Sequence, residues 1–88
     1  MRYTNLVTIN GKCYYVSTTY NIVDHGWETM VFLVEGEHPD EEDPNTQNLN
    51  IDWSDLYQEL YGSEEAAWAG HKRIVANLAE YLENQEEK

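Results

Sequence analysis

Carboxylates dominate the side chains of this chain that could do chemistry. The 88 residues include 17 Asp and Glu against 5 Lys and Arg, which gives a formal net charge of −12. They are densest in the stretch 35–43, which lacks apolar residues and which we take as the centre of an acidic loop spanning 35–50. The stretch has hard oxygen ligands but lacks the alternating ligands and the bidentate twelfth-position glutamate of a calcium-binding EF-hand. A solvated acidic segment is therefore the better interpretation, and we predict neither a metal nor a cofactor.

Histidine and cysteine offer little to a catalyst or a zinc site. His25, His38 and His71 include no pair at i, i+4 spacing, and the lone Cys13 forms no thiolate pair. A nucleophilic cysteine needs a base beside it, whereas Cys13 falls in a predicted strand with only Lys12 as a cationic neighbour. A packed thiol is the better interpretation, and we predict that the protein is not an enzyme.

Aromatic side chains are numerous, with 7 Tyr, 3 Trp and 1 Phe. A core of this size cannot bury them all, and tyrosine and tryptophan are typical anchors of protein interfaces. Packing under the helix accounts for part of the set, but Trp53 lies between two aspartates and Tyr57 follows closely. The predicted partner-binding residues are Glu37, Asp40, Glu41, Glu42, Asp43, Asp52, Trp53, Asp55 and Tyr57.

The elements that must position these residues begin with three strands. Alternating β-branched and aromatic residues predict strands at 3–9, 12–20 and 27–34. Asn10-Gly11 between the first two is the strongest short signal for a hairpin with a type I′ turn. The third strand is apolar on both faces at its far end, so we expect it at the centre of the sheet.

The C-terminal half is predicted to supply a fourth strand and a helix. Residues 50–61 fit either helical or strand spacing, and we favour a strand at 54–61 because Gly62-Ser63 then separates it from a helix. Ser63 is a good N-cap, and the helix is expected to reach about Asn84, leaving 84–88 as a frayed tail. Gly70 inside the helix suggests a close approach to the sheet.

The predicted fold class is thus α+β, with a three- to four-stranded antiparallel sheet and one C-terminal helix packed on a face. We expect residues 1–88 to form a single domain. No apolar run reaches the length of a membrane span, and the N-terminus opens no signal peptide. The lone cysteine fits a reducing compartment, so we expect a cytoplasmic protein.

The charge indicates the kind of partner. A polyanion binds neither nucleic acid nor anionic lipid directly, so the acidity favours a basic partner, and many basic proteins bind nucleic acid. Alternate carboxylates on one face of a strand lie about 6.6–7 Å apart. Successive phosphates on one strand of a duplex are spaced about as far apart, so a rim of acids can imitate DNA.

Two segments resemble short phage and prophage proteins of Gram-positive bacteria. The resemblance rests on Trp27-Glu28-Thr29-Met30-Val31-Phe32 and on the run from Trp53 to His71, with its Ser63-Glu64-Glu65-Ala66 helix start and Gly70-His71 pair. Together they cover about half of the chain. No site residue is carried over from that group, but the resemblance implies a phage setting. By analogy of size, charge and setting, it points to anti-CRISPR and other counter-defence proteins, which are often DNA mimics.

Our hypothesis from the sequence is an acidic phage-type inhibitor that blocks the basic nucleic-acid channel of a host protein, such as a CRISPR effector. The alternative is a homo-oligomeric accessory or structural phage protein without inhibitory activity, paired through a sheet edge or an aromatic patch. A homodimer is compatible with either.

Overall fold

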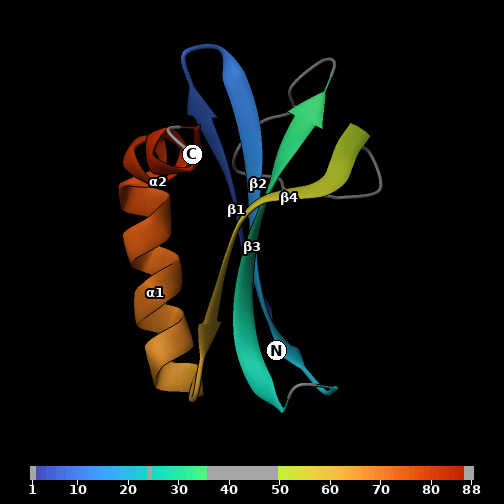
Figure 1. The fold of residues 1–88 in the computed structure, drawn as a ribbon, viewed down its shortest axis with the longest axis vertical. Coiled ribbons are helices and arrows are strands. Elements are labelled where there is room, and N and C mark those ends of the chain that lie inside the picture. The colour runs from blue at the N-terminus through green and yellow to red at the C-terminus, as the bar shows by residue number, and fades with distance from the viewer. Residues whose placement is uncertain (1, 24, 36–49, 87–88) are drawn as a thin grey trace.

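The structure, a computed structural model, describes residues 2–23, 25–35 and 50–86, with side chains to Glu83. In chain order the elements are β1 (Arg2–Ile9), β2 (Lys12–Asn21), β3 (Gly26–Glu35), β4 (Asn50–Tyr61), α1 (Glu64–Ala76) and α2 (Leu78–Glu86). The four strands form one antiparallel sheet in the order β1-β2-β3-β4, and both helices lie along one face of it (Figure 1). The predicted α+β class is confirmed.

Local sequence explains the path of the sheet. Asn10 and Gly11 have φ of 51° and 81°, the two positive angles that a type I′ turn needs, so the predicted hairpin is confirmed. β3 lies between β2 and β4, and its Val31 and Phe32 are buried on opposite faces, as expected for a central strand. The favoured strand at 54–61 is also confirmed as part of β4.

The face beneath the helices carries one apolar cluster. Val16 and Val31 pack against Ile74 of α1 and Leu78 of α2, and all four side chains are at most 2% exposed. Val7, Tyr57 and Tyr81 border this cluster. Ser63 caps α1 as predicted, since its hydroxyl accepts from the Ala66 N–H at 3.1 Å. Burial of this apolar cluster holds the two helices on the sheet.

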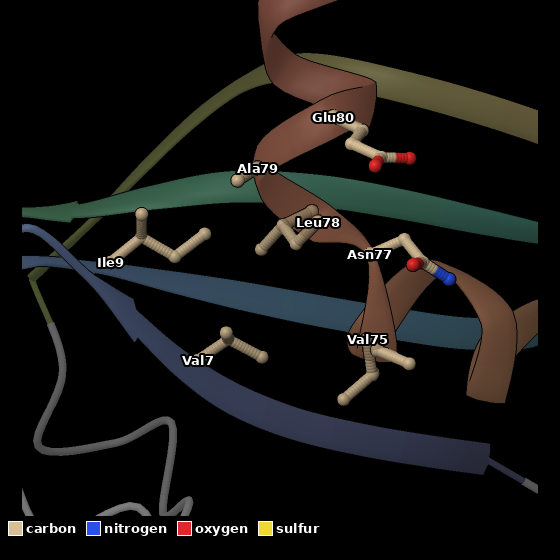
Figure 2. A pocket seen from close by; sticks show the side chains of 8 residues that line it. Val7, Ile9, Val75, Asn77, Leu78, Ala79 and Glu80 are labelled. Atoms are coloured by element: carbon tan, nitrogen blue, oxygen red, sulfur yellow. The ribbon is translucent and has the colours of Figure 1, made fainter.

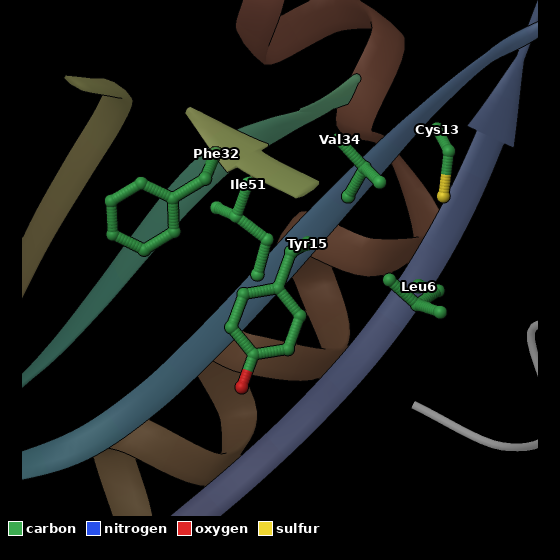
Figure 3. Packing of buried hydrophobic residues seen from close by; sticks show 6 residues of the cluster. All are labelled: Leu6, Cys13, Tyr15, Phe32, Val34 and Ile51. Atoms are coloured by element: carbon green, nitrogen blue, oxygen red, sulfur yellow. The ribbon is translucent and has the colours of Figure 1, made fainter. Parts of the chain in front are cut away.

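The opposite face carries a second apolar cluster. Figure 3 shows its six side chains on the side of the strands turned away from the helices: Leu6, Cys13, Tyr15, Phe32, Val34 and Ile51. All six are buried, and they alternate along the strands with the residues that face the helices. The sheet therefore has an apolar layer on each side, although the described helices cover only one.

A chain of polar side chains crosses the helix-side cluster. Thr29 and Thr18 join their hydroxyls at 2.5 Å, Thr18 Oγ1 lies 2.7 Å from His71 Nδ1, and His71 Nε2 lies 2.7 Å from Asn5 Oδ1. His71 is only 1% exposed. A neutral imidazole satisfies both contacts, because Nε2–H donates to Asn5 and Nδ1 accepts from Thr18. Burial accordingly lowers the pKa of His71.

The C-terminal helix is interrupted where the sequence predicts one continuous helix. Asn77 has φ −126° and ψ 27°, and its side-chain amide donates to the Arg73 carbonyl at 3.0 Å. Its own carbonyl accepts from Glu80 N–H at 3.0 Å and so starts α2. A short polar side chain that competes for backbone hydrogen bonds explains the break. The structure continues α2 to Glu86, past the start of the predicted tail.

Gly70 has the role that its position suggests. A Cβ at Gly70 would overlap the phenol of Tyr61, the last residue of β4. The helix therefore approaches the sheet more closely here than any side chain at residue 70 allows, which confirms the predicted close approach.

Candidate functional site

A large bulge interrupts the pairing of β4 with β3. Val31 of β3 lies opposite Tyr57, and Leu33 lies opposite Asp52. Between these two pairs the single residue Phe32 faces four residues of β4: Trp53, Ser54, Asp55 and Leu56. β4 accordingly bends sharply in mid-strand (Figure 1). Bulges redirect side chains at sheet edges and occur preferentially beside functional sites, so these four residues with Asp52, here named the β4 bulge, form the candidate site.

In the β4 bulge an exposed tryptophan lies between two exposed aspartates along the chain. Asp52, Trp53 and Asp55 are all exposed, and the Trp53 side chain is 64% exposed. The indole meets Phe32 edge to face at 5.1 Å, so one side of it rests on the buried cluster beneath. The Ser54 N–H donates to Asp52 Oδ1 at 3.0 Å and stiffens the turn. A supported but exposed tryptophan of this kind suits a protein interface.

The structure brings together only part of the predicted partner-binding set. Asp52, Trp53 and Asp55 share the bulge, whereas Tyr57 is half-buried on the helix side of the sheet. Its ring packs against Tyr81 at 5.0 Å, and its hydroxyl donates to Glu59 at 3.3 Å. Burial, followed by the charge of Glu59, raises the pKa of Tyr57. Trp53 and Tyr57 therefore face opposite sides. The remaining predicted residues lie outside the described ones: Glu37, Asp40, Glu41, Glu42 and Asp43.

Several other carboxylates have internal partners. Glu59 pairs with Arg73 at 2.5 Å and accepts from the Tyr61 hydroxyl at 2.6 Å, on the helix side of the sheet. Glu64 accepts from the Tyr3 hydroxyl at 3.0 Å, a contact that raises the pKa of Tyr3. Acids within the described ranges therefore lie on the helix side of the sheet and on both helices as well as in the bulge.

A hollow that the sequence pattern does not predict lies beside the bulge. It measures about 200 Å³ and opens on the face away from the helices, with Trp53 in its wall. Its other lining residues are Arg2, Tyr15, Ser17, Thr19, Met30 and Phe32. Alternation places most of these on one face of the predicted strands, which is the signal that could have grouped them. The position of Trp53 depends on the bulge and could not be foreseen.

A second hollow lies between β1 and the junction of the two helices (Figure 2). It measures about 300 Å³, and Val7, Ile9 and Leu78 supply much of its apolar lining. Its polar residues are Asn77 and Glu80, and no nucleophilic side chain lines the hollow beside them. This cleft has the character of incomplete packing at the helix break.

An aromatic group lies at the start of α1, away from the bulge. Tyr3 contacts Trp68 at 4.6 Å, Trp68 stacks on His71 at 6.0 Å, and the Lys72 ammonium lies 5.0 Å from the Trp68 ring centre. These contacts attach α1 to β1. They give a packing role to aromatic residues whose role the sequence does not decide. Trp68 remains 43% exposed.

The part of the chain that the structure describes holds neither a metal-binding cluster nor a membrane-spanning helix. There, no three His, Cys, Asp or Glu side chains gather in a way that could hold a metal ion. Neither α1 nor α2 has the length and apolar character needed to cross a bilayer.

Comparisons with protein-family models, curated proteins and solved structures found no match to this chain.

Proposed function

We propose that the protein is a non-enzymatic acidic inhibitor of the phage counter-defence kind, which docks on the basic nucleic-acid channel of a host protein such as a CRISPR effector. The observation that carries the proposal is the β4 bulge, where an exposed tryptophan on an apolar support is flanked by two exposed aspartates. A flat aromatic anchor with acidic neighbours along the chain complements a surface of Lys and Arg side chains.

The charge of the whole chain supports the same kind of partner. A net charge of −12 on 88 residues attracts a basic surface over distances well beyond contact and speeds encounter at low salt. Asp52 and Asp55 would then pair with Lys or Arg as Trp53 is desolvated. The acidic segment around Glu37 and Asp40–Asp43 would add to the attraction as a substitute for the phosphates of DNA.

The test is inhibition of DNA binding by a purified CRISPR effector–guide complex from a Gram-positive bacterium. The double variant Asp52→Asn/Asp55→Asn is compared with Glu80→Gln/Glu83→Gln, which removes the same charge from exposed positions on α2. We expect the first pair to weaken inhibition by about tenfold or more at low salt, since each desolvated charge pair contributes over 1 kcal/mol. The α2 pair should change it little.

Trp53→Ala separates docking from general acidity. Because hot-spot truncations cost about 2 kcal/mol or more, we expect the variant to lose roughly 30-fold in potency while keeping its net charge. Full potency in Trp53→Ala would exclude the bulge as the docking site. Equal losses in both acidic double variants would show that charge acts without a defined surface.

A homo-oligomeric accessory protein remains the competing hypothesis, since β1 and β4 are the two edges of the described sheet. Light scattering distinguishes the two. A stable dimer that Trp53→Ala dissociates, together with no effect on DNA binding by the effector, would favour the accessory role over the inhibitor.

A further inference from the structure

The hollow beside the bulge combines features of a small-ligand site. Tyr15, Met30, Phe32 and Trp53 provide apolar and aromatic walls, while Arg2, Ser17 and Thr19 provide polar groups. Small-molecule sites are typically apolar pockets with a few convergent polar groups that fix the orientation of the ligand.

Strand register brings the polar groups to one end. Arg2 lies directly opposite Thr19 in the β1–β2 pair. Ser17 lies two residues before Thr19, on the same face of β2. Residues opposite one another in an antiparallel pair have Cβ atoms about 4.5–5.5 Å apart. The guanidinium and two hydroxyls are therefore neighbours, and Tyr15 and Phe32, opposite each other in the next pair, extend the wall toward Trp53.

Arg2 has no counter-charge among the side chains that the structure describes. Among the described residues its side chain forms no ion pair and no hydrogen bond, although the chain has 17 carboxylates. Glu28, opposite Thr19 on β3, is the nearest candidate in register. Its two oxygens instead accept from Asn21 Nδ2 at 3.3 Å and Gln58 Nε2 at 3.0 Å.

We infer that this hollow binds a small aromatic monocarboxylate, with its ring against the wall that Phe32 and Trp53 form and its carboxylate on Arg2. Guanidinium and carboxylate form a strong charge-assisted pair, often with two parallel hydrogen bonds, and the Ser17 hydroxyl can donate to the same oxygens. A volume of about 200 Å³ suits a one-ring acid and lies below the range of drug-sized pockets. The inference does not depend on the proposed inhibitor role.

The experiment is a titration of the whole isotope-labelled protein with 3-phenylpropionate, followed by NMR. We expect shifts at the Arg2 Nε–H, the Trp53 indole N–H and the backbone of Ser17 and Thr19. The alcohol 3-phenylpropanol, which keeps the ring but lacks the charge, should bind about tenfold more weakly or worse, because it loses the charge-assisted pair. Acetate, which has the charge without the ring, should also bind weakly.

Two variants make the assignment specific. Arg2→Gln should weaken 3-phenylpropionate binding by about tenfold, whereas Lys12→Gln removes the same charge from the far end of the strands and should leave it unchanged. Retained NMR dispersion in Arg2→Gln would show that the variant is folded. Equal binding by acid and alcohol, undiminished binding in Arg2→Gln, or shifts confined to another surface would each overturn the inference. Tighter binding of a short peptide ending in phenylalanine would also overturn it, in favour of a protein C-terminus as the ligand.

Discussion

His71 is buried with both ring nitrogens engaged, and that makes its protonation costly. In the neutral ring Nδ1 accepts from Thr18 and Nε2–H donates to Asn5. A second ring proton would point at Thr18 Oγ1 and force both threonine hydroxyls to reverse. Burial of the charge adds to this cost and lowers the pKa of His71.

The stability of the fold should therefore depend on pH through His71. Its pKa is near 6.5 in the unfolded chain and lower in the folded protein, so the unfolded state binds more protons as the pH falls. The contribution of His71 to the free energy of unfolding is fully present above about pH 6.5. It is lost as the pH drops toward the pKa of His71 in the folded protein. In that window the slope for one group approaches about 1.4 kcal/mol per pH unit, which urea unfolding between about pH 7.5 and 5 would measure.

Variants of two histidines identify the group responsible. His71→Gln should flatten the dependence, whatever its effect on absolute stability. His25→Asn, at an exposed turn position, should leave the slope as it is. An unchanged slope in His71→Gln would assign the pH dependence to other groups.

At the scale of elements, the seating of α1 on β4 depends on one missing side chain. Gly70→Ala gains about 1 kcal/mol in helix propensity but places a Cβ on the Tyr61 ring. Overpacking typically costs about 1–3 kcal/mol, so we expect a net loss of stability and a lower melting temperature. Thermal unfolding followed by circular dichroism would measure it.

Gly62→Ala is the matched control, because a Cβ there meets nothing within 4 Å. In a Tyr61→Ala background, Gly70→Ala should cost much less than in the parent, since the obstructing ring is gone. A stabilised Gly70→Ala protein would mean that the ring moves aside and that the close approach does not require glycine.

The sequence predicted the regular elements well and their interruptions poorly. Alternation along β2 and β3, the Asn10-Gly11 turn and the Ser63 cap are local signals, and each led to the correct element. The break at Asn77 arises where a side chain competes for backbone hydrogen bonds. The bulge at Trp53–Leu56 arises where the two faces of one strand must meet different apolar clusters. Such features depend on tertiary packing, so periodicity does not reveal them.

The candidate site was predicted in part for the same reason. An aromatic residue between acids predicts a site at Asp52, Trp53 and Asp55, and the bulge keeps these three together. Tyr57 was grouped with them by proximity in sequence, but the bulge places it on the other face. No sequence pattern points to Arg2, because only strand pairing brings it near Thr19 and the Trp53 hollow.

At the scale of the whole molecule, a net charge of −12 should make the fold sensitive to salt. Like charges repel more strongly in the compact state, and raising NaCl from about 0.01 M to 1 M shortens the Debye length from about 30 Å to 3 Å. We expect the melting temperature to rise by several degrees, since each kcal/mol corresponds to about 4–8 °C in a domain of this size.

The ion pair between Arg73 and Glu59 opposes this trend only weakly, because exposed pairs contribute less than about 1 kcal/mol. Choline chloride should act like NaCl if general screening is responsible. A melting temperature that stays constant or falls with both salts would mean that self-repulsion does not limit the stability of this fold.

The β4 bulge also bears on how such a chain can change over evolutionary time. In a regular strand, one inserted or deleted residue turns every following side chain to the wrong face. Here four residues already span the space of one, so the strand segments on either side keep their orientation independently. The tip that carries Trp53 can therefore lengthen, shorten or exchange residues while Ile51 and Tyr57 remain in their separate apolar layers, leaving this part of the surface open to rapid diversification.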